Sequence, residues 1–262
     1  MTLRLFIFRH GETEWSLSGQ HTGHTDIMLT KHGEEEARKL GTRIAKIDFS
    51  HVLVSPLQRA KRTCELAGLI KFSHKEFGLT EWDYGDYEGR TSADIRTIRR
   101  GWNLFHDGCP HGEMPLQMSN RVDRLIALLE NLDGNVALFT HGHLGRVLAA
   151  RWIGLSVDFA QHFLLNTASI SILSYEHNQP SQPAILLWNS TVASIPQMLA
   201  EPSFQRKPQK ADAVIKPQAI ECWENEGGSL ISLYSGSRWR HGTDQAKRYF
   251  KPNLPLEFQS DL

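Results

Sequence analysis

Cysteine is scarce in this sequence, which has only three among its 262 residues. Cys64, Cys109 and Cys222 form no close-spaced pair, and an odd number of thiols cannot pair completely within one chain. Disulfide scaffolds and structural zinc sites need more cysteines at closer spacing. We therefore expect neither feature, and the sequence predicts a reducing, cytoplasmic location.

An excess of one charge is also missing. The chain has 29 Lys and Arg residues against 29 Asp and Glu residues, so its formal net charge is zero. Proteins that bind nucleic acid or anionic membranes over a whole surface carry a basic excess. The sequence therefore predicts no nucleic-acid partner and no membrane partner, while a homo-oligomer is left open.

Long apolar runs are absent as well. No stretch approaches the roughly 18 residues that cross a bilayer. The apolar segment at residues 1–8 is followed at once by charged residues and has no small-residue cleavage site. Because it is too short for a signal peptide, it predicts a buried first strand.

The first two-thirds of the chain alternate short apolar runs with helical patterns. Strands are predicted at 3–8, 51–54, 136–139, 169–175 and 185–188, and helices at 30–47, 57–69, 122–132 and 144–153. This alternation indicates an α/β protein, here a three-layer αβα sandwich around a mainly parallel central sheet. Thr30 is predicted to cap the first of these helices.

The composition changes near Thr191. Residues 192–219 carry repeated Pro, Gln and Lys, which is typical of a linker. Residues 220–262 are rich in aromatic side chains but too few for a clear second domain. We therefore predict one domain over 1–191 and a C-terminal extension of unknown role over 192–262.

Two predicted strands are each followed by histidine and glycine. Arg9-His10-Gly11 follows the first strand, and His141-Gly142-His143 follows the strand at 136–139. Ligands of open α/β sheets bind beyond the carboxyl ends of the strands, so both histidines are expected at one crevice. A single Arg-His pair would more often be structural. The close spacing of His141 and His143, without nearby Cys, Asp or Glu, predicts no metal site, whereas the helix that follows suits a phosphate.

Two further segments carry groups suited to the same chemistry. Ser55 is expected to cap a helix with Pro56 at its first position, so that Arg59 points toward the strand ends. Taken alone, Arg59 would more often be a solvated helix residue. The loop at 79–89 mixes carboxylates with aromatic residues, a setting in which Glu81 can act as a general acid.

Together these segments resemble the histidine phosphatase superfamily, also called phosphoglycerate-mutase-like. Its motifs are matched in family order by Arg9-His10-Gly11, the segment 55–60, the acidic loop 79–89 and His141-Gly142. The resemblance covers about residues 1–188 and implies a phosphatase that hydrolyses phosphate monoesters without a metal or other cofactor. Within the superfamily the chain is most similar to the sedoheptulose-1,7-bisphosphatase subgroup, which implies a small phosphorylated substrate, a sugar phosphate or sugar bisphosphate.

The resemblance also implies roles for individual residues. His10 is expected to become phosphorylated, and Glu81 to protonate the departing oxygen and then to activate water. The phosphoryl oxygens are expected to be held by Arg9, Arg59 and His141. Substrate contacts are expected from Ser16, Thr22, Gly23, Tyr84, Gly142, His143 and Arg146. Arg146 matches an arginine that holds a second, non-reacting phosphate.

Two other functions stay open at this point. A phosphoglycerate mutase would use the same residues but return the phosphoryl group to its product. The compact stretch 89–136 favours hydrolysis, and Arg99-Arg100 favours the mutase. A catalytically inert module that binds phosphorylated ligands usually lacks the nucleophile or the acid, but both His10 and Glu81 are present.

Three remaining features are expected to have no catalytic role. His21, His24 and His32 are predicted on the surface. Glu113 and Arg121 form an ion pair that steadies a loop, or stay solvated; the sequence leaves both open. The tripeptide at 240–242 repeats Arg-His-Gly without a preceding apolar strand, so it is predicted to be a coincidence.

Overall fold

The structure is a computed structural model that describes residues 2–191. Its centre is a six-stranded sheet with the order β3-β2-β4-β1-β5-β6. The strands are β1 Arg4–Arg9, β2 His51–Val54, β3 Ser73–Lys75, β4 Asn135–Thr140, β5 Ile170–Tyr175 and β6 Pro183–Ser190. The first four strands pair in parallel, and β5 pairs antiparallel with both β1 and β6. The predicted mainly parallel sheet is confirmed.

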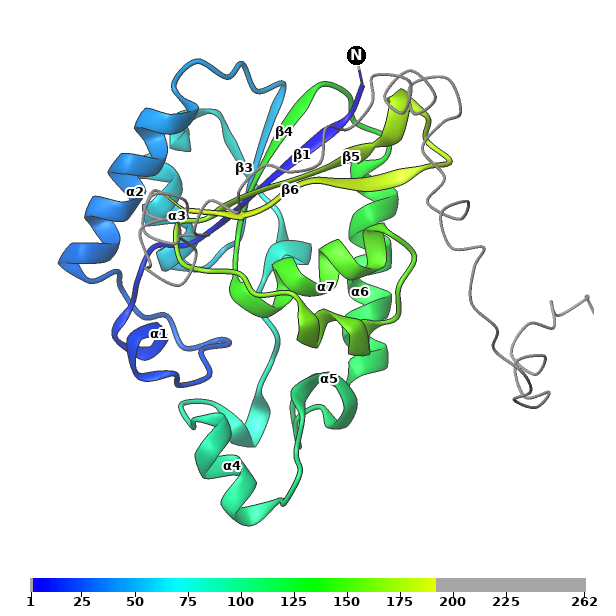
Figure 1. Ribbon diagram of the computed structural model, residues 1–262. Coiled ribbons are helices and arrows are strands. Elements are labelled where there is room, and N and C mark those ends of the chain that lie inside the picture. Colours follow the sequence, from blue (N-terminus) through cyan, green and yellow to red (C-terminus); the bar gives the residue numbers. More distant parts are fainter. Residues whose placement is uncertain (1, 192–262) are drawn as a thin grey trace, which may run out of the picture. The chain divides into compact units, whose positions relative to one another are not determined.

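Helices cover both faces of this sheet. The four long helices are α2 Lys31–Ile44, α3 Gln58–Leu66, α6 Pro115–Leu129 and α7 Gly142–Trp152. Helices α2 and α3 lie on one face, and α6 and α7 lie on the other (Figure 1). Side chains alternate along β1, so Phe6 and Phe8 pack toward α2 and α3, while Leu5 and Ile7 pack toward α6 and α7. The predicted three-layer sandwich is therefore confirmed.

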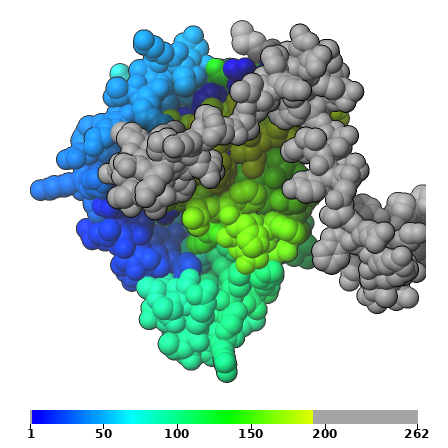
Figure 2. Space-filling view, in the orientation of Figure 1, coloured from blue at the N-terminus to red at the C-terminus, as the bar shows by residue number. Residues whose placement is uncertain are grey.

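Several short elements were not predicted from the sequence. They are the edge strand β3, the helices α1 Glu14–Ser18, α4 Ser92–Ile98 and α5 Leu104–Asp107, and the 3-10 turns Ile70–Phe72, Phe77–Leu79, Gly85–Tyr87, Val157–His162 and Glu176–Asn178. Helix α4 buries only Ile95, so it shows no apolar periodicity. It is held at its start by a capping box between Thr91 and Asp94. The segment around α4 and α5 forms the turquoise end of the described part in Figure 2.

The predicted start of α6 and the predicted cap at Ser55 are wrong, whereas the other helix boundaries differ from the prediction by at most three residues. Helix α6 begins at Pro115 rather than at residue 122, because a proline at its first position and Gln117 on the Met114 N–H start it earlier. Helix α3 begins at Gln58, and Ser55 does not cap it. The Ser55 hydroxyl instead lies 2.7 Å from Nε2 of His141. The predicted cap at Thr30 is confirmed, since its side chain accepts from the Gly33 N–H.

The sheet register brings the predicted motifs to one edge. Arg9 at the end of β1 pairs with Thr140 at the end of β4. Beyond this pair the His10 N–H donates to the Thr140 carbonyl at 2.9 Å, and the Ser55 N–H donates to the Phe139 carbonyl at 3.0 Å. The carboxyl ends of three parallel strands therefore lead into one crevice, as the sequence predicted.

The predicted C-terminal extension 192–262, with its linker at 192–219 and the tripeptide at 240–242, lies outside the described residues. Within residues 2–191, no helix is long and apolar enough to cross a membrane.

Candidate active site

His10 is mounted directly after β1 and is 5% exposed. Its Nδ1 lies 2.7 Å from the Gly11 carbonyl oxygen. Because a carbonyl oxygen can only accept, Nδ1 carries the proton of the neutral ring and Nε2 keeps its lone pair. Burial, followed by the nearby Arg59 and Arg9 cations, lowers the pKa of His10 well below 6.5. The ring is thus a neutral imidazole, the form that can act as a nucleophile.

Glu81 is held by three backbone N–H groups and is 5% exposed. Its Oε1 accepts from Trp82 at 2.9 Å and from Leu144 at 2.8 Å, and its Oε2 accepts from His143 at 2.9 Å. Two of these donors belong to the first turn of α7, where N–H groups have no partner within the helix. Oε1 accepts two hydrogen bonds, so both of its lone pairs are occupied, whereas Oε2 accepts one and keeps one lone pair free. The carboxyl group is therefore fixed in place with Oε2 available for proton transfer.

Arg9 lies beside His10 with an unsatisfied donor. Its Nη1 donates to the Leu165 carbonyl, and its guanidinium packs against Gly142, where an added Cβ would meet Cζ at 3.4 Å. Among residues 2–191, Nε of Arg9 is the single fully buried side-chain polar atom without a hydrogen-bond partner. Buried donors are nearly always paired, so this side chain lacks an acceptor that an anion could supply.

Arg59 is fully buried and connects His141 to the loop that follows α1. Its Nε donates to Nδ1 of His141 at 3.2 Å, and Nη2 donates to the Thr22 and Gly23 carbonyls, both at 2.9 Å. The Nη1 donates to the Thr25 carbonyl at 3.0 Å. Arg59 therefore positions this loop and orients His141.

His141 faces His10 across the ends of the two strands, with ring centroids 5.3 Å apart. Because Nδ1 accepts from Arg59, its Nε2 carries the proton and donates to the Ser55 hydroxyl. Burial, followed by Arg59, lowers the pKa of His141 well below 6.5, so this ring is neutral too.

A cavity of about 260 Å³ opens over these groups. Its lining residues are Arg9, His10, Trp15, Ser16, Gly19, Gln20, His21, Thr22, Glu81, Tyr84, Ser92, Gly142, His143, Arg146 and Leu165. Nine of the twelve predicted site residues are in this lining. Arg59 and His141 lie directly behind it. Gly23 is turned away, since its N–H donates to the Glu88 carboxylate at 2.9 Å.

Six lining residues were not predicted: Trp15, Gly19, Gln20, His21, Ser92 and Leu165. Trp15, Gly19, Gln20 and His21 lie in the same stretch as Ser16 and Thr22, which were predicted to contact the substrate, so their place near the cavity could have been inferred. Leu165 belongs to no motif and reaches the cavity only through the path of the chain after α7.

Arg146 extends from α7 into the same cavity. Its Nε donates to the Ala160 carbonyl at 3.0 Å and its Nη2 to the Gln161 carbonyl at 2.9 Å. Its Cζ lies 4.7 Å from the centroid of the Phe105 ring. Burial lowers the pKa of Arg146 to about 10, so it stays a cation at neutral pH. A second fixed positive charge is therefore present at the cavity.

The prediction that His21 lies on the surface is wrong. It is 8% exposed, and its ring stacks on Tyr84 at 4.7 Å and meets Trp102 edge-on at 5.5 Å. Both partners lie more than 60 residues away in the sequence, which is why a local pattern could not reveal this burial. Within residues 2–191, no group of three or more His, Cys, Asp or Glu side chains is arranged to hold a metal ion.

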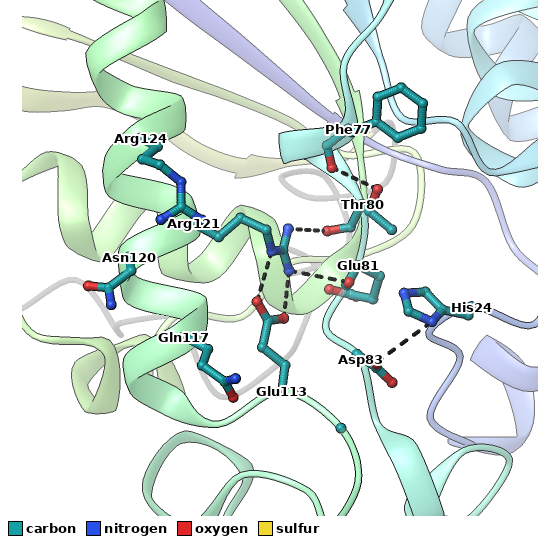
Figure 3. A pocket seen from close by; sticks show the side chains of 11 residues that line it. His24, Phe77, Thr80, Glu81, Asp83, Glu113, Gln117, Asn120, Arg121 and Arg124 are labelled. Atoms are coloured by element: carbon teal, nitrogen blue, oxygen red, sulfur yellow. Dashed lines mark hydrogen bonds and ion pairs between the residues drawn. The ribbon is translucent and has the colours of Figure 1, made fainter.

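The loop that carries Glu81 is fastened by Arg121 on α6, beside a second, more open pocket of about 550 Å³ (Figure 3). Arg121 forms a two-pronged ion pair with Glu113 at 2.7 and 2.8 Å, which decides the alternative left open by the sequence. Its guanidinium also donates to the carbonyls of Gly78, Thr80 and Glu81. Three hydrogen bonds thus fix the backbone around Glu81, and the ion pair with Glu113 holds the Arg121 guanidinium in place.

Replacement of Arg121 by alanine is therefore expected to lower the free energy of unfolding by about 2 kcal/mol, because it leaves a half-buried carboxylate and three carbonyls unpaired. Urea denaturation measures this change. Arg124→Ala is the matched control, since Arg124 lies on the same helix, is exposed and has no ion pair within the described part of the chain. Equal stability of the two variants would contradict the assignment.

Comparison with known proteins agrees with this geometry. The family model of the histidine phosphatase superfamily (branch 1) matches residues 5–191. The chain belongs to this superfamily. This membership confirms the fold and, with relatives named as phosphatases, the predicted class of phosphoric monoester hydrolase.

Individual relatives of this histidine phosphatase cover most of its described part. An acid phosphatase of Mycobacterium tuberculosis is 39% identical, over 66% of this chain and 87% of the relative. A sedoheptulose 1,7-bisphosphatase of Saccharomyces cerevisiae is 31% identical, over 71% of this chain and 93% of the relative. Proteins named as phosphoglycerate mutases are also similar. A solved structure from Mycobacterium tuberculosis has a TM-score of 0.69 and 36% identity, over 73% of this chain and 99% of that chain.

Proposed function

We propose that this histidine phosphatase hydrolyses a sugar phosphate or sugar bisphosphate through a phosphohistidine formed on His10. The observation that supports this most directly is the neutral His10 ring, whose Nε2 is unprotonated at a cavity that also contains Arg9 and Glu81. A nucleophile, a cation with an unpaired donor and a fixed carboxyl group are the parts that phosphoryl transfer to histidine requires.

The proposed reaction has two steps. In the first, the lone pair on Nε2 of His10 attacks phosphorus, the bond from phosphorus to the sugar oxygen breaks, and Glu81 gives its proton to that oxygen. In the second, Glu81 takes a proton from a water molecule, whose oxygen attacks the phosphohistidine. The phosphorus–nitrogen bond breaks, inorganic phosphate leaves, and His10 and the protonated Glu81 are regenerated.

The charge that moves onto the transferred group is proposed to be stabilised by the cations beside His10. Arg9 lacks an acceptor for Nε, and the N-terminus of α7 adds its positive end at Gly142. Arg59 and His141 adjoin this place but are not in the lining. Four of the five N–H groups of Arg59 and the N–H of His141 already have acceptors in the protein, so both residues mainly position the site, and one Nη1 hydrogen of Arg59 is left for a phosphoryl oxygen.

The substrate class follows from the second cation. Arg146 lines the same cavity as His10, and its Nη1 makes no hydrogen bond within the described residues. A phosphate on a second carbon of the substrate would supply an acceptor for it. The proposed substrate is therefore a small sugar carrying one reacting phosphate and, at its other end, a second one.

A phosphate-release screen over sugar monophosphates and bisphosphates tests this proposal with the full chain. We expect release from sugar phosphates, with higher kcat/KM for bisphosphates. A parallel assay with 3-phosphoglycerate and a bisphosphate primer tests the mutase. Conversion to 2-phosphoglycerate at a rate exceeding phosphate release would replace the hydrolase by a phosphotransferase.

Arg146→Ala is expected to lower kcat/KM about 10- to 100-fold on sugar bisphosphates and less than about threefold on monophosphates, because one charge-assisted hydrogen bond is lost only with the former. The control is Arg151→Ala on the same helix, whose side chain pairs with Asp123 outside the cavity. This variant should leave the ratio of kcat/KM on bisphosphates to kcat/KM on monophosphates unchanged. An equal loss on both classes for Arg146→Ala would remove Arg146 from second-phosphate binding.

A further inference from the structure

Two oxygen atoms lie near the same nitrogen of His143. The Tyr84 hydroxyl is 2.5 Å from Nδ1, within hydrogen-bond distance. Oε2 of Glu81 is 4.0 Å from the same Nδ1, just beyond that distance. Oε2 is also the Glu81 oxygen with an acceptor position left for proton transfer, since it accepts one backbone N–H whereas Oε1 accepts two. A hydrogen bond from Nδ1 to Glu81 would therefore occupy the carboxyl oxygen that the reaction needs.

The direction of the bond between Tyr84 and His143 follows from their protonation. Burial, followed by the Glu81 charge, raises the pKa of Tyr84 well above 10, so the phenol keeps its proton. Burial, followed by Arg146, His21 and Arg9, lowers the pKa of His143 well below 6.5, so its ring is neutral. The Tyr84 hydroxyl has no other hydrogen-bond partner among residues 2–191, so its proton is paired only if it is donated to His143. Nδ1 is then the acceptor, and the ring proton lies on Nε2.

The Nε2 atom of His143 is open to the cavity. His143 lines the cavity, and 22% of its side chain is exposed. Within residues 2–191, Nε2 has no hydrogen-bond partner and is not among the fully buried atoms that lack one. Its N–H is therefore a donor offered to whatever enters.

We propose that Tyr84 is a positioning residue: its hydroxyl holds His143 as the Nε2–H tautomer, with this donor facing the substrate, and keeps Nδ1 away from Glu81. The Tyr84 hydroxyl itself is used by His143, so it does not serve as a substrate contact in this arrangement. The group that His143 recognises must be an acceptor, such as a sugar oxygen or a phosphate oxygen. The catalytic consequence of this assignment rests on the proposed function. The tautomer of His143 does not, because it follows from the contact with Tyr84.

The packing around Tyr84 and His143 holds both rings in place. The Tyr84 ring is buried, with 1% exposure, and is stacked on His21 at 4.7 Å. The His143 ring is bounded by Phe105 at 5.5 Å and by His21 at 5.8 Å. Neither ring can turn away without displacing these neighbours, so the hydrogen bond does not depend on a bound ligand.

Loss of the hydroxyl has a defined consequence. In Tyr84→Phe, Nδ1 loses its donor, and the space left by the hydroxyl lets the His143 ring shift toward Oε2 of Glu81, 4.0 Å away. The ring proton is then expected to move from Nε2 to Nδ1, where it can be donated to the carboxylate. The cavity would lose a donor, and Glu81 would lose the acceptor position used for proton transfer.

Nitrogen-15 NMR of histidine-labelled protein tests the tautomer without any substrate. The signals of His143 are identified by their loss in His143→Gln. We expect Nε2 to be the protonated nitrogen in the wild type, and the proton to shift to Nδ1 in Tyr84→Phe. Tyr87→Phe is the matched control, because Tyr87 is buried in the same loop and its hydroxyl has no hydrogen-bond partner among residues 2–191. An unchanged tautomer in Tyr84→Phe would overturn the proposal.

Kinetics then test the consequence. Tyr84→Phe is expected to lower kcat on a sugar phosphate about tenfold, the effect of one lost hydrogen bond of about 1.4 kcal/mol. His143→Gln offers an amide donor in place of Nε2 and has no tautomers, so adding Tyr84→Phe to it should cost less than about twofold. Full additivity of the two losses would mean that Tyr84 acts on the substrate directly and would overturn the proposal. If the wild type releases no phosphate from sugar phosphates, the proposed function fails, while NMR still decides the tautomer.

Discussion

Replacement of His10 by alanine is expected to reduce phosphatase turnover by about 10⁴-fold or more. The proposed reaction forms its covalent bond at Nε2 of this ring, and the neighbouring His141 cannot take its place, since both of its nitrogens are engaged by Arg59 and Ser55. Losses of this size are usual when a covalent nucleophile is removed. Steady-state phosphate release on the best substrate of the screen measures the effect.

The matched control is His74→Ala, which removes an exposed histidine on β3 and should keep wild-type turnover. Trapping with a ³²P-labelled substrate adds a second measurement. Acid-labile label should remain on the wild type and on His74→Ala but not on His10→Ala. Turnover near the wild-type value in His10→Ala would end the phosphohistidine mechanism.

Glu81→Gln is expected to reduce kcat on sugar phosphates by about 10²- to 10³-fold, the usual contribution of a general acid. The amide cannot protonate the departing sugar oxygen. In the wild type, Oε2 accepts a hydrogen bond from the backbone N–H of His143. The NH₂ group of the glutamine would take the place of this oxygen and meet the N–H as a second donor. On p-nitrophenyl phosphate, whose leaving group needs no proton, the first step should be nearly unaffected, whereas the second step loses its base. Phosphoenzyme should therefore accumulate.

Rapid-quench measurement of phosphohistidine separates these two effects. We expect a burst of nitrophenolate followed by slow turnover in Glu81→Gln. Asp86→Asn is the control, because Asp86 is an exposed carboxylate of the same loop that pairs with His111. The same loss on both substrates, without accumulation of phosphoenzyme, would argue that Glu81 only supports the backbone of α7.

The sequence predicts the sheet and the position of the nucleophile because both are local. Strand β1 is a continuous apolar run, and His10 follows it directly, so its place at the carboxyl edge needs no knowledge of distant residues. The same holds for His141 after β4. The local signal for α4 was also present, in the capping box between Thr91 and Asp94, although its apolar periodicity is absent.

Features that depend on distant partners could not be predicted in this way. The role of Ser55 as a partner of His141 depends on a residue 86 positions away, and a helix cap was the simpler local interpretation. The burial of His21 depends on Tyr84 and Trp102. The occupied donors of Arg59 depend on the loop at 22–25, so an arginine expected to face a phosphate instead contacts backbone carbonyls. These interactions become visible only when the chain is folded.

The two arginines beside His10, Arg9 and Arg59, also affect how much more stable the protein is with an anion bound than without one. Burial lowers the pKa of both Arg9 and Arg59, and within residues 2–191 neither forms an ion pair with a carboxylate. Desolvated cations without a neutralising anion destabilise the fold, so an anion that enters the site relieves this cost. Inorganic phosphate is such an anion. The electrostatics that draw in a phosphorylated substrate are therefore expected to retain the product also, so that departure of phosphate competes with the chemical steps in limiting turnover.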